Sequence, residues 1–404
     1  MNKPDQNSKP AFSGERVRLG DAFDLQMGKT PSRDNSSYWN NGDHEWVSIK
    51  DLGTYGKYVG STKETISELG RAESGIKPVP ANTLIMSFKL SLGKTAITTR
   101  ETYTNEAIMA FLEKGDHEIN LDYMWHQFRS KDWTVGTNTA VMGKTLNKKT
   151  LGDSTIRIPS LAEQIEIADI LDKVLGQIDA TNNQVSHLQS LVKSRFVEMF
   201  GSKDFDHKPL VKCVSSIDSG KSPICSSSPR ANRDPAVLKL SAISSGVYRE
   251  GENKGLLPGE AIVDSKEVVQ GDILLARKNT PELVGRSVYV ARTEGNIMFP
   301  DIVFRMHPRP VVNGIYLAHV LSGPMFGEVK SLAHGSAKSM SNIPKSKLAN
   351  LQIPLPPLPL QREFAAFAER AAKLEFAALV QYPYKFLFNG GCSHDNRRGK
   401  EKGR

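Results

Sequence analysis

The stretch STIRIPSLAEQIEIADIL, residues 154–171, has a near copy in LQIPLPPLPLQREFAAFA, residues 351–368. Each copy has the pattern of a short strand that leads into a helix. Five landmarks match without a gap at an offset of 197 residues: Leu151, Ile156, Pro159, Leu161 and Gln164 with Leu348, Ile353, Pro356, Leu358 and Gln361. A period of this length is too long for a solenoid, so it indicates two copies of a whole domain.

The match continues upstream in the same order, with small shifts that are typical of loops of different length. The matched pairs are LQMGKTPS (25–32) with IDSGKSPI (217–224), WVSIKDL (46–52) with VLKLSAI (237–243), VPANTLIMSFK (79–89) with VVQGDILLARK (268–278), and DYMWH (122–126) with GIYLAH (314–319). Short β-branched segments between Gly- and Ser-rich turns predict strands, and a short helical segment follows them. We therefore predict an α+β fold with two repeated domains.

A long helix is predicted after the first copy. Ser160 is suited to be its N-cap, with Glu163 three residues later, and no proline occurs from there to Gly201. Apolar residues recur at the three-to-four spacing of a coiled coil: Ile167, Leu171, Val174, Ile178, Val185, Leu188, Val192 and Met199, with Thr181 as the weak position. Such a helix is about 60 Å long. It is either a spacer between two domains, which we favour for its length, or a packing helix inside one globule.

The second helix begins near Leu358 and is about half as long, since Pro383 ends the pattern. The predicted organisation has six parts: a disordered N-terminus (1–15), a first domain (16–158), a long spacer helix (159–201), a second domain (208–356), a shortened second helix (357–381) and a basic, disordered tail (382–404). The two helices are expected to form an antiparallel coiled coil.

Composition favours a cytoplasmic protein with a polyanionic partner. The formal net charge is +9, and about four of these charges come from residues 382–404. Three cysteines without a C-x-x-C pair argue for a reducing compartment and against a structural zinc site. The N-terminus lacks the apolar segment of a signal peptide, and no apolar run is long enough to span a membrane.

No catalytic or metal-binding constellation is recognisable, and no cofactor is predicted. Gly-Lys-[Ser/Thr] triplets begin at Gly28, Gly93, Gly143 and Gly220, but none has the glycine five residues earlier that a phosphate-binding loop requires. The glycine pattern of a dinucleotide fold, the His-Glu-x-x-His pair of a zinc peptidase and the Gly-x-Ser-x-Gly turn of a hydrolase are also missing. We therefore do not predict an enzyme.

The ordered set of repeats resembles the specificity (S) subunit of type I restriction-modification systems. The resemblance covers residues about 16 to 376 and is carried by LNKKTLGDSTIRIPSLAEQIEIADIL (146–171), the helix starts at Gln164 and Gln361, and the Gly-Lys-[Ser/Thr]-Pro loops at 28–31 and 220–223. It implies two target-recognition domains that each read half of a split double-stranded DNA sequence. The short second helix departs from the family pattern and bears on how one methyltransferase would dock.

The resemblance also implies partners rather than intrinsic activity. An S subunit binds two methyltransferase (M) subunits and directs their S-adenosylmethionine-dependent adenine methylation. It directs ATP-dependent cleavage when the motor and endonuclease (R) subunits join. A duplicated protein-interaction scaffold without DNA specificity is the alternative, and it predicts no salt-dependent affinity for DNA.

Candidate DNA contacts come from loops at matching places in the two copies. They are Lys29, Ser32, Arg33, Lys50, Lys89 and Lys94 in the first copy, and Lys221, Arg230, Lys239, Arg277, Lys278 and Arg286 in the second. Lysine and arginine would contact phosphates or base edges, although each of these residues could equally be a solvated surface group. Gly28 and Gly220 are expected to allow turns with positive φ. Tyr38, Trp39 and Trp46 either stack on bases or, as we favour, pack in the core.

Overall fold

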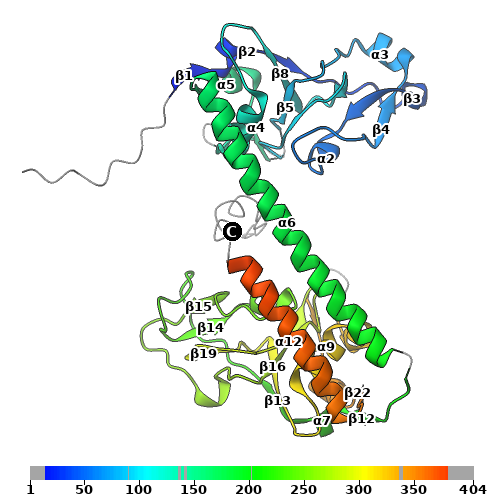
Figure 1. Ribbon diagram of the computed structural model, residues 1–404, viewed down its shortest axis with the longest axis vertical. Coiled ribbons are helices and arrows are strands. Elements are labelled where there is room, and N and C mark those ends of the chain that lie inside the picture. The colour runs from blue at the N-terminus through cyan, green and yellow to red at the C-terminus, as the bar shows by residue number, and fades with distance from the viewer. Residues whose placement is uncertain are drawn as a thin grey trace, which may run out of the picture. The chain divides into compact units, whose positions relative to one another are not determined.

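The computed structural model describes residues 14–89, 91–134, 138–140, 143–201, 203–335 and 340–380, and the chain divides into two compact units, residues 1–177 and 178–404 (Figure 1). The predicted disordered tail (382–404) and all but the last two residues of the predicted disordered N-terminus lie outside the described residues. The fold is α+β, as predicted from the repeats.

The first unit is built on a four-stranded antiparallel sheet, in the order β2-β8-β5-β6, and a three-stranded sheet, in the order β4-β3-β7. Their strands are β2 (Phe23–Met27), β8 (Ile108–Glu113), β5 (Leu84–Ser87), β6 (Thr95–Ile97), β4 (Glu64–Ile66), β3 (Trp39–Val47) and β7 (Tyr103–Thr104). Two-stranded pairs join β1 (Glu15–Arg18) to β11 (Thr155–Ile158), and β9 (Asn138–Ala140) to β10 (Gly143–Thr145). The helices are α1 (Leu19–Ala22), η1 (Ser36–Tyr38), α2 (Ile49–Leu52), α3 (Glu68–Ser74), α4 (Leu121–Ser130) and α5 (Lys148–Gly152).

The second unit repeats this plan. Its four-stranded sheet has the order β13-β20-β16-β18 and its three-stranded sheet the order β15-β14-β19. The strands are β13 (Val214–Ser219), β20 (Val303–Pro308), β16 (Ile273–Ala276), β18 (Ser287–Tyr289), β15 (Asn253–Gly255), β14 (Ala236–Leu238) and β19 (Ile297–Met298), with the pairs β12 (His207–Pro209) to β22 (Gln352–Pro354) and β17 (Lys278–Asn279) to β21 (Ser341–Asn342). The helices are α7 (Leu210–Cys213), α8 (Ser241–Ser244), η2 (Asp264–Lys266), α9 (Gly314–Ser322), α10 (Phe326–Ser331), α11 (Lys345–Ala349) and α12 (Leu358–Val380).

Strand pairing confirms that the sequence repeat is a structural repeat. In both units the middle strand of the three-stranded sheet pairs antiparallel with one neighbour and parallel with the other. The strand pairs of both four-stranded sheets are antiparallel throughout. Two stretches that share this unusual mixture of pairings in the same chain order are copies of one domain.

The central strands of the large sheets are apolar without alternation because both of their faces are covered. In β5, Leu84 and Met86 join the cluster that contains α4, whereas Ile85 joins the one beside the small sheet. In β16, Ile273 and Leu275 face the α9 side, whereas Leu274 packs with residues of β14. Successive side chains of a strand point to opposite faces, so burial of both faces requires a continuous apolar run.

The helix start that recurs in the sequence is held by a buried glutamine. Gln164 and Gln361 are 0% and 1% exposed. The Gln164 Oε1 accepts a hydrogen bond from the Asn120 backbone N–H (2.8 Å), and its Nε2 donates to the Pro159 carbonyl (2.9 Å). A buried amide without hydrogen-bond partners lowers the stability of the fold. These two hydrogen bonds therefore fix where the helix begins.

The same bonds recur in the second copy. The Gln361 Oε1 accepts from the Asn313 N–H (2.9 Å), and its Nε2 donates to the Pro356 carbonyl (2.7 Å). Asn120 and Asn313 are themselves the N-caps of α4 and α9. Each glutamine therefore ties the start of a long helix to the start of a short one, and the sequence motif Pro-x-Leu-x-x-Gln is the signature of that junction.

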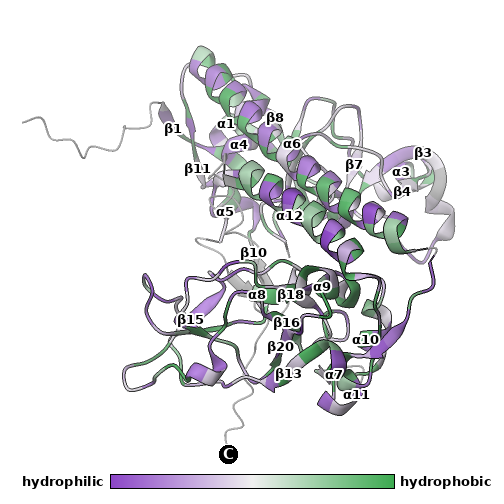
Figure 2. Ribbon diagram, turned by 60° about the horizontal axis from the view of Figure 1, so that its bottom comes forward, coloured by the Kyte–Doolittle hydropathy of each residue, from purple (hydrophilic) through white to green (hydrophobic). Residues whose placement is uncertain are grey.

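The long helix α6 (Leu161–Phe200) has 40 residues and begins where the sequence predicted. Ser160 and Glu163 form the expected capping box: the Ser160 N–H donates to the Glu163 carboxylate (3.2 Å), and the Glu163 N–H donates to the Ser160 hydroxyl (3.4 Å). In the second unit Val185, Leu188 and Val192 are half-buried, and apolar and polar residues alternate along both long helices (Figure 2). Thr181, the weak position of the pattern, is buried.

Within the second unit, the end of α6 and the start of α12 run antiparallel. The Arg195 guanidinium lies 2.8 Å from the Glu363 carboxylate, and the Phe196 and Phe364 rings meet edge to face at 5.2 Å. Earlier in α6, Gln189 hydrogen-bonds Glu375, which lies later in α12. This reversed order of contacts is that of an antiparallel coiled coil. The structure describes α12 as far as Val380.

His319 of α9 is enclosed at this helix junction. Its ring lies 5.1 Å from that of Phe364, and loss of hydration lowers the pKa of His319 to about 4. The imidazole is therefore neutral in the folded protein at neutral pH.

Replacement of Gln361 by alanine should lower the free energy of unfolding by about 1–3 kcal/mol, because the Asn313 N–H and the Pro356 carbonyl both lose their buried partner. Urea unfolding followed by circular dichroism measures this. The exposed Gln352 of the same unit is the control, and Gln352→Ala should change stability by less than about 0.5 kcal/mol. Equal effects of the two substitutions would contradict the assigned role of Gln361.

The stability of the second unit should fall as pH drops below 6.5. A histidine with a lowered folded-state pKa binds a proton more readily when unfolded, so its contribution is fully present above 6.5 and is lost as pH falls towards 4. The loss should be on the order of 2 kcal/mol between pH 7.5 and pH 5. His319→Leu should flatten this dependence in urea titrations at several pH values, whereas substitution of the exposed His187 should leave it intact.

Candidate nucleic-acid interface

The two Gly-Lys-[Ser/Thr]-Pro loops occupy the same place in the two units, directly after β2 and β13. The Lys29 N–H donates to the Thr104 carbonyl (2.8 Å), and the Lys221 N–H donates to the Phe299 carbonyl (3.1 Å). Next in each loop a hydroxyl bonds a carboxylate: Thr30 with Glu106, and Ser222 with Asp301. These repeated bonds orient the chain that enters each small sheet.

The expected reason for the loop glycines is wrong. Neither Gly28 nor Gly220 has positive φ. A Cβ at Gly28 would instead lie closer than 3.0 Å to the carbonyl oxygens of Thr104 and Asn105, and a Cβ at Gly220 would meet the Phe299 and Pro300 carbonyls in the same way. Glycine is required here because two stretches of backbone approach each other too closely for a side chain.

The candidate DNA contacts of the first unit differ in their exposure and in the contacts that they make within the protein. Ser32, Arg33 and Lys50 are exposed. The Arg33 guanidinium lies 2.6 Å from the Glu64 carboxylate and 3.6 Å from the centre of the Trp39 ring, so it is an exposed cation on an aromatic support. The Lys29 ammonium bonds the Ser74 carbonyl.

The remaining first-unit candidates and the aromatic residues lie closer to the core. Lys89 and Lys94 are half-buried, and the Lys89 ammonium is 5.1 Å from the Phe88 ring. Trp39 and Trp46 are 7% and 1% exposed and form an apolar cluster with Ile66, Ile76 and Tyr103. These two tryptophans are thus core residues and not stacking platforms, as the favoured interpretation held.

Three of the second-unit arginines are engaged within their own unit. Arg230 has a side chain that is 5% exposed and lies 2.7 Å from the Glu250 carboxylate. The Arg277 Nε donates to the Asn342 side chain (3.1 Å), and the Arg286 guanidinium lies 4.2 Å from the Phe326 ring. Each of these predicted DNA contacts thus has a partner within its own unit, and its role towards DNA stays a prediction.

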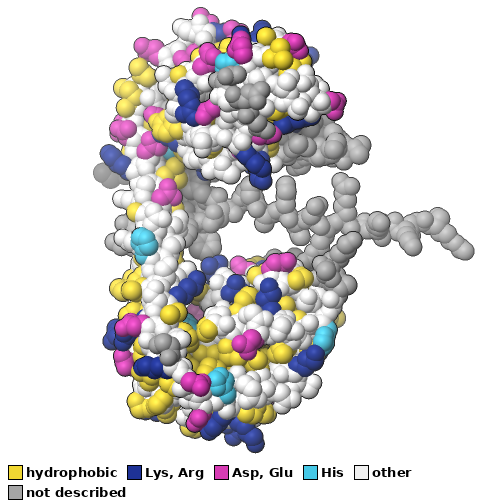
Figure 3. All heavy atoms as spheres, turned by 90° about the vertical axis from the view of Figure 1, so that its right-hand side faces the viewer, with side chains coloured by type: hydrophobic (Ala, Val, Ile, Leu, Met, Phe, Trp, Pro, Cys, Tyr) yellow, Lys and Arg dark blue, Asp and Glu magenta, His cyan; other side chains and the backbone are white. Residues whose placement is uncertain are grey.

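The lysines of the second unit remain available to different degrees. Lys221 is exposed, whereas Lys239 and Lys278 are half-buried. On the face drawn in Figure 3, Lys and Arg side chains are scattered among acidic ones over each unit, without one continuous basic band among the coloured residues. With such a surface, a few individual contacts of Lys and Arg would contribute more to the binding of a polyanion than a uniform positive potential.

A charged network that sequence reasoning missed attaches α6 to the first unit. The Lys57 ammonium lies 2.8 Å from Asp122 and 2.6 Å from Asp172, and the His126 Nε2 lies 2.8 Å from the second carboxylate oxygen of Asp172. Asp172 is on α6, and Asp122 and His126 are on α4. The pairing of Tyr123/His126 with Tyr316/His319 marked this helix, but a single sequence carries no sign that Lys57 lies beside it.

The described residues contain no group of three or more His, Cys, Asp or Glu side chains that could hold a metal ion. Within the same residues, no helix is long and apolar enough to cross a membrane.

Alanine at Gly28 or Gly220 should destabilise its unit by about 1–3 kcal/mol, because the new methyl group forces carbonyl oxygens apart in a packed region. Gly56 is the control: a Cβ there meets nothing within 4 Å and its φ is not positive, so Gly56→Ala should be neutral or slightly stabilising. Urea unfolding of the three variants tests this. Wild-type stability of both Gly28→Ala and Gly220→Ala would contradict the close approach.

Comparison with known proteins gives a consistent result. The sequence model of the type I restriction modification DNA specificity domain matches residues 14–189. The specificity subunit of the type I restriction enzyme EcoEI from Escherichia coli is 34% identical over 151 residues, which are 37% of this chain and 25% of that subunit. The first curated relatives are matched over 25% to 43% of their own length, so the chain spans less than half of each.

Solved structures share the fold over nearly the whole chain. The type I restriction-modification S subunit from M. genitalium has a TM-score of 0.58 and 11% identity, and the match covers 96% of this chain and 95% of that one. A chain from a study of the assembly and conformational transition of a type I restriction-modification system has a TM-score of 0.51 and 18% identity, with 94% and 97% covered. Residues 14–189 are thus similar in sequence to the type I restriction modification DNA specificity domain, and the whole chain shares the fold of solved type I S subunits.

Proposed function

We propose that the chain is the non-catalytic DNA-recognition subunit of a type I restriction-modification complex. Two target-recognition domains (16–158 and 208–356) each read one half of a bipartite double-stranded DNA target, and the helices 159–201 and 357–381 space them. The chain directs adenine methylation by two M subunits and ATP-dependent cleavage when R subunits join. It acts in the cytoplasm, where the DNA and these subunits are found.

One observation carries this proposal: the duplicated framework presents two small sheets of different chemistry. The first unit packs tryptophans under an exposed Arg33, whereas the second has a buried Arg230–Glu250 ion pair at the corresponding sheet. Equal frameworks with unequal surfaces suit an asymmetric target, because each half-site needs its own pattern of donors and acceptors in the major groove.

The long helices offer surface to protein partners. Leu191 and Val197 of α6 are 52% and 65% exposed, and Leu374 and Phe376 of α12 are 59% and 68% exposed. Large apolar side chains that remain exposed beside a coiled-coil seam are suited to bind another protein. We propose that the M subunits cover them.

Single-molecule methylation sequencing tests the function directly. DNA from cells that co-express the chain with its cognate M subunit should carry methylated adenine in a motif of two short half-sites separated by a fixed gap. The M subunit expressed alone is the control and should give no such motif. No new methylation with the chain present, while a full-length S subunit is active in the same cells, would overturn the proposal and favour a scaffold without DNA specificity.

A further inference from the structure

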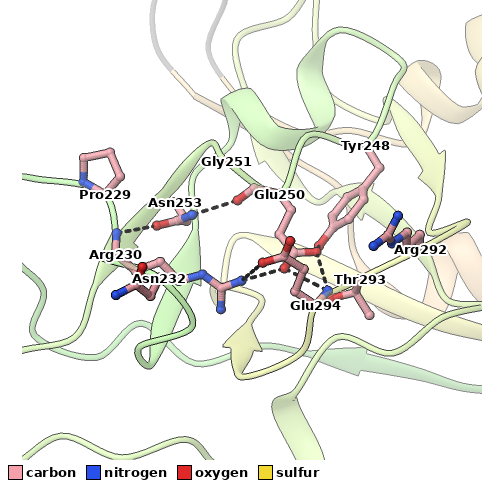
Figure 4. A pocket seen from close by; sticks show the side chains of 10 residues that line it. All are labelled: Pro229, Arg230, Asn232, Tyr248, Glu250, Gly251, Asn253, Arg292, Thr293 and Glu294. Atoms are coloured by element: carbon pink, nitrogen blue, oxygen red, sulfur yellow. Dashed lines mark hydrogen bonds and ion pairs between the residues drawn. The ribbon is translucent and has the colours of Figure 1, made fainter. Parts of the chain in front are cut away.

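The second unit contains a polar hollow in its three-stranded lobe. It measures about 430 Å³ and lies between the segments 229–232, 248–253 and 292–294 (Figure 4). These segments flank β14, β15 and β19, the strands of the small sheet. The hollow thus lies on the part of the repeat that differs in chemistry between the two units.

The floor of the hollow is a saturated ion pair. The Arg230 Nη2 lies 2.7 Å from the Glu250 carboxylate, and its Nη1 donates to the Gly295 carbonyl (2.8 Å). The Glu250 carboxylate also accepts bonds from the Tyr248 hydroxyl (3.3 Å) and the Glu294 N–H (3.1 Å). Burial of both charges costs desolvation free energy, so the Arg230–Glu250 pair is weak evidence of a net gain in stability. Its structural role is to hold the surrounding loops in place.

Asn253 completes this floor from β15. It is 3% exposed, its side-chain oxygen accepts from the Arg230 N–H (2.9 Å), and its amide donates to the Glu250 carbonyl (2.8 Å). In Figure 4, dashed lines join Asn253 to Arg230 and to Glu250, and another joins the Arg230 guanidinium to the Glu250 carboxylate. The bonds of Glu250 with Arg230 and with the Glu294 N–H therefore join all three surrounding segments before any ligand arrives.

The rim of the hollow carries polar side chains that remain exposed to solvent. Asn232, Arg292 and Glu294 are exposed, and the Glu294 carboxylate retains 51% of its accessible surface at 3.7 Å from the Arg230 guanidinium. Amide, guanidinium and carboxylate are the side-chain groups that pair with base edges in the major groove. The exposed cations Arg233, Arg249 and Lys254 adjoin these segments and suit phosphate contacts.

Among the described side chains of the first unit, the corresponding place holds an apolar cluster. Val237 is the counterpart of Trp46 in the repeat, and each pairs with both neighbours of its middle strand. Trp46 lies in an apolar cluster, whereas the lobe that contains the smaller Val237 has loops that meet through Arg230 and Glu250. A shared framework has thus been given two different lobes.

We propose that the rim of this hollow reads bases in the half-site of the second unit, with Glu294 accepting a hydrogen bond from the exocyclic amino group of adenine or cytosine. This inference rests on the proposed function. An exposed carboxylate next to DNA is repelled by the phosphates unless a donor compensates it, and a carboxylate can only accept. It therefore selects the amino groups of adenine and cytosine and rejects guanine and thymine, which present acceptors at that point of the groove.

Glu294→Gln separates this role from general binding. A glutamine keeps the shape but can also donate, so one position of one half-site should become degenerate. Methylation at sites with guanine or thymine at that position should rise roughly tenfold over wild type in single-molecule sequencing. The half-site read by the first unit should not change. Glu328→Gln, at an exposed carboxylate on α10 of the same unit, is the matched control and should leave the whole motif unchanged.

The outcomes separate the two proposals. A gapped wild-type motif that Glu294→Gln leaves unaltered, or alters in both halves, overturns the role of Glu294 but upholds DNA recognition. A wild type without any gapped motif overturns the proposed function and this inference together. Relaxation confined to one half-site, absent in Glu328→Gln, supports both.

Discussion

The buried glutamine carboxamide at each long-helix start is the interaction on which the rest of the molecule depends. Through Gln164 and Gln361, a helix that leaves a domain is bonded to the cap of the helix that covers the large sheet of that domain. Loss of either glutamine would leave buried backbone groups without their partner, because both side chains are buried. The direction in which each long helix leaves its domain is therefore fixed by bonds within the domain fold.

Side chains nearby reinforce this junction differently in the two copies. In the first unit the Lys57–Asp172–His126 network holds α6 through charge, and in the second Phe364 packs against His319 and Phe196. The same helix junction is thus supported by ion pairs in the first copy and by aromatic packing in the second. The hydrogen-bonded glutamine is common to both copies.

Much of the fold could be predicted from the sequence because the chain contains two copies of one domain that can be compared with each other. Matching Gln164 with Gln361 revealed the repeat, and the Ser160–Glu163 box and the apolar spacing placed α6 correctly. Individual side-chain roles could not be predicted in this way. In the sequence Arg230 is an ordinary loop arginine, and only the fold shows that it pairs with Glu250, twenty residues away. Likewise, glycine is required at position 28 because of the carbonyls of residues 104 and 105. Contacts between distant segments leave no local trace in one sequence.

The division between the two units falls inside α6, between residues 177 and 178, so an uninterrupted helix is shared by both. In a helix, length and rotation are coupled: each added residue advances the axis by about 1.5 Å and turns it by about 100°. An insertion near residue 178 would thus lengthen α6 and also turn one end of the helix about its axis relative to the other. Insertions of about seven or eleven residues nearly restore the phase. The length of α6 therefore cannot be changed independently of the directions in which its side chains point.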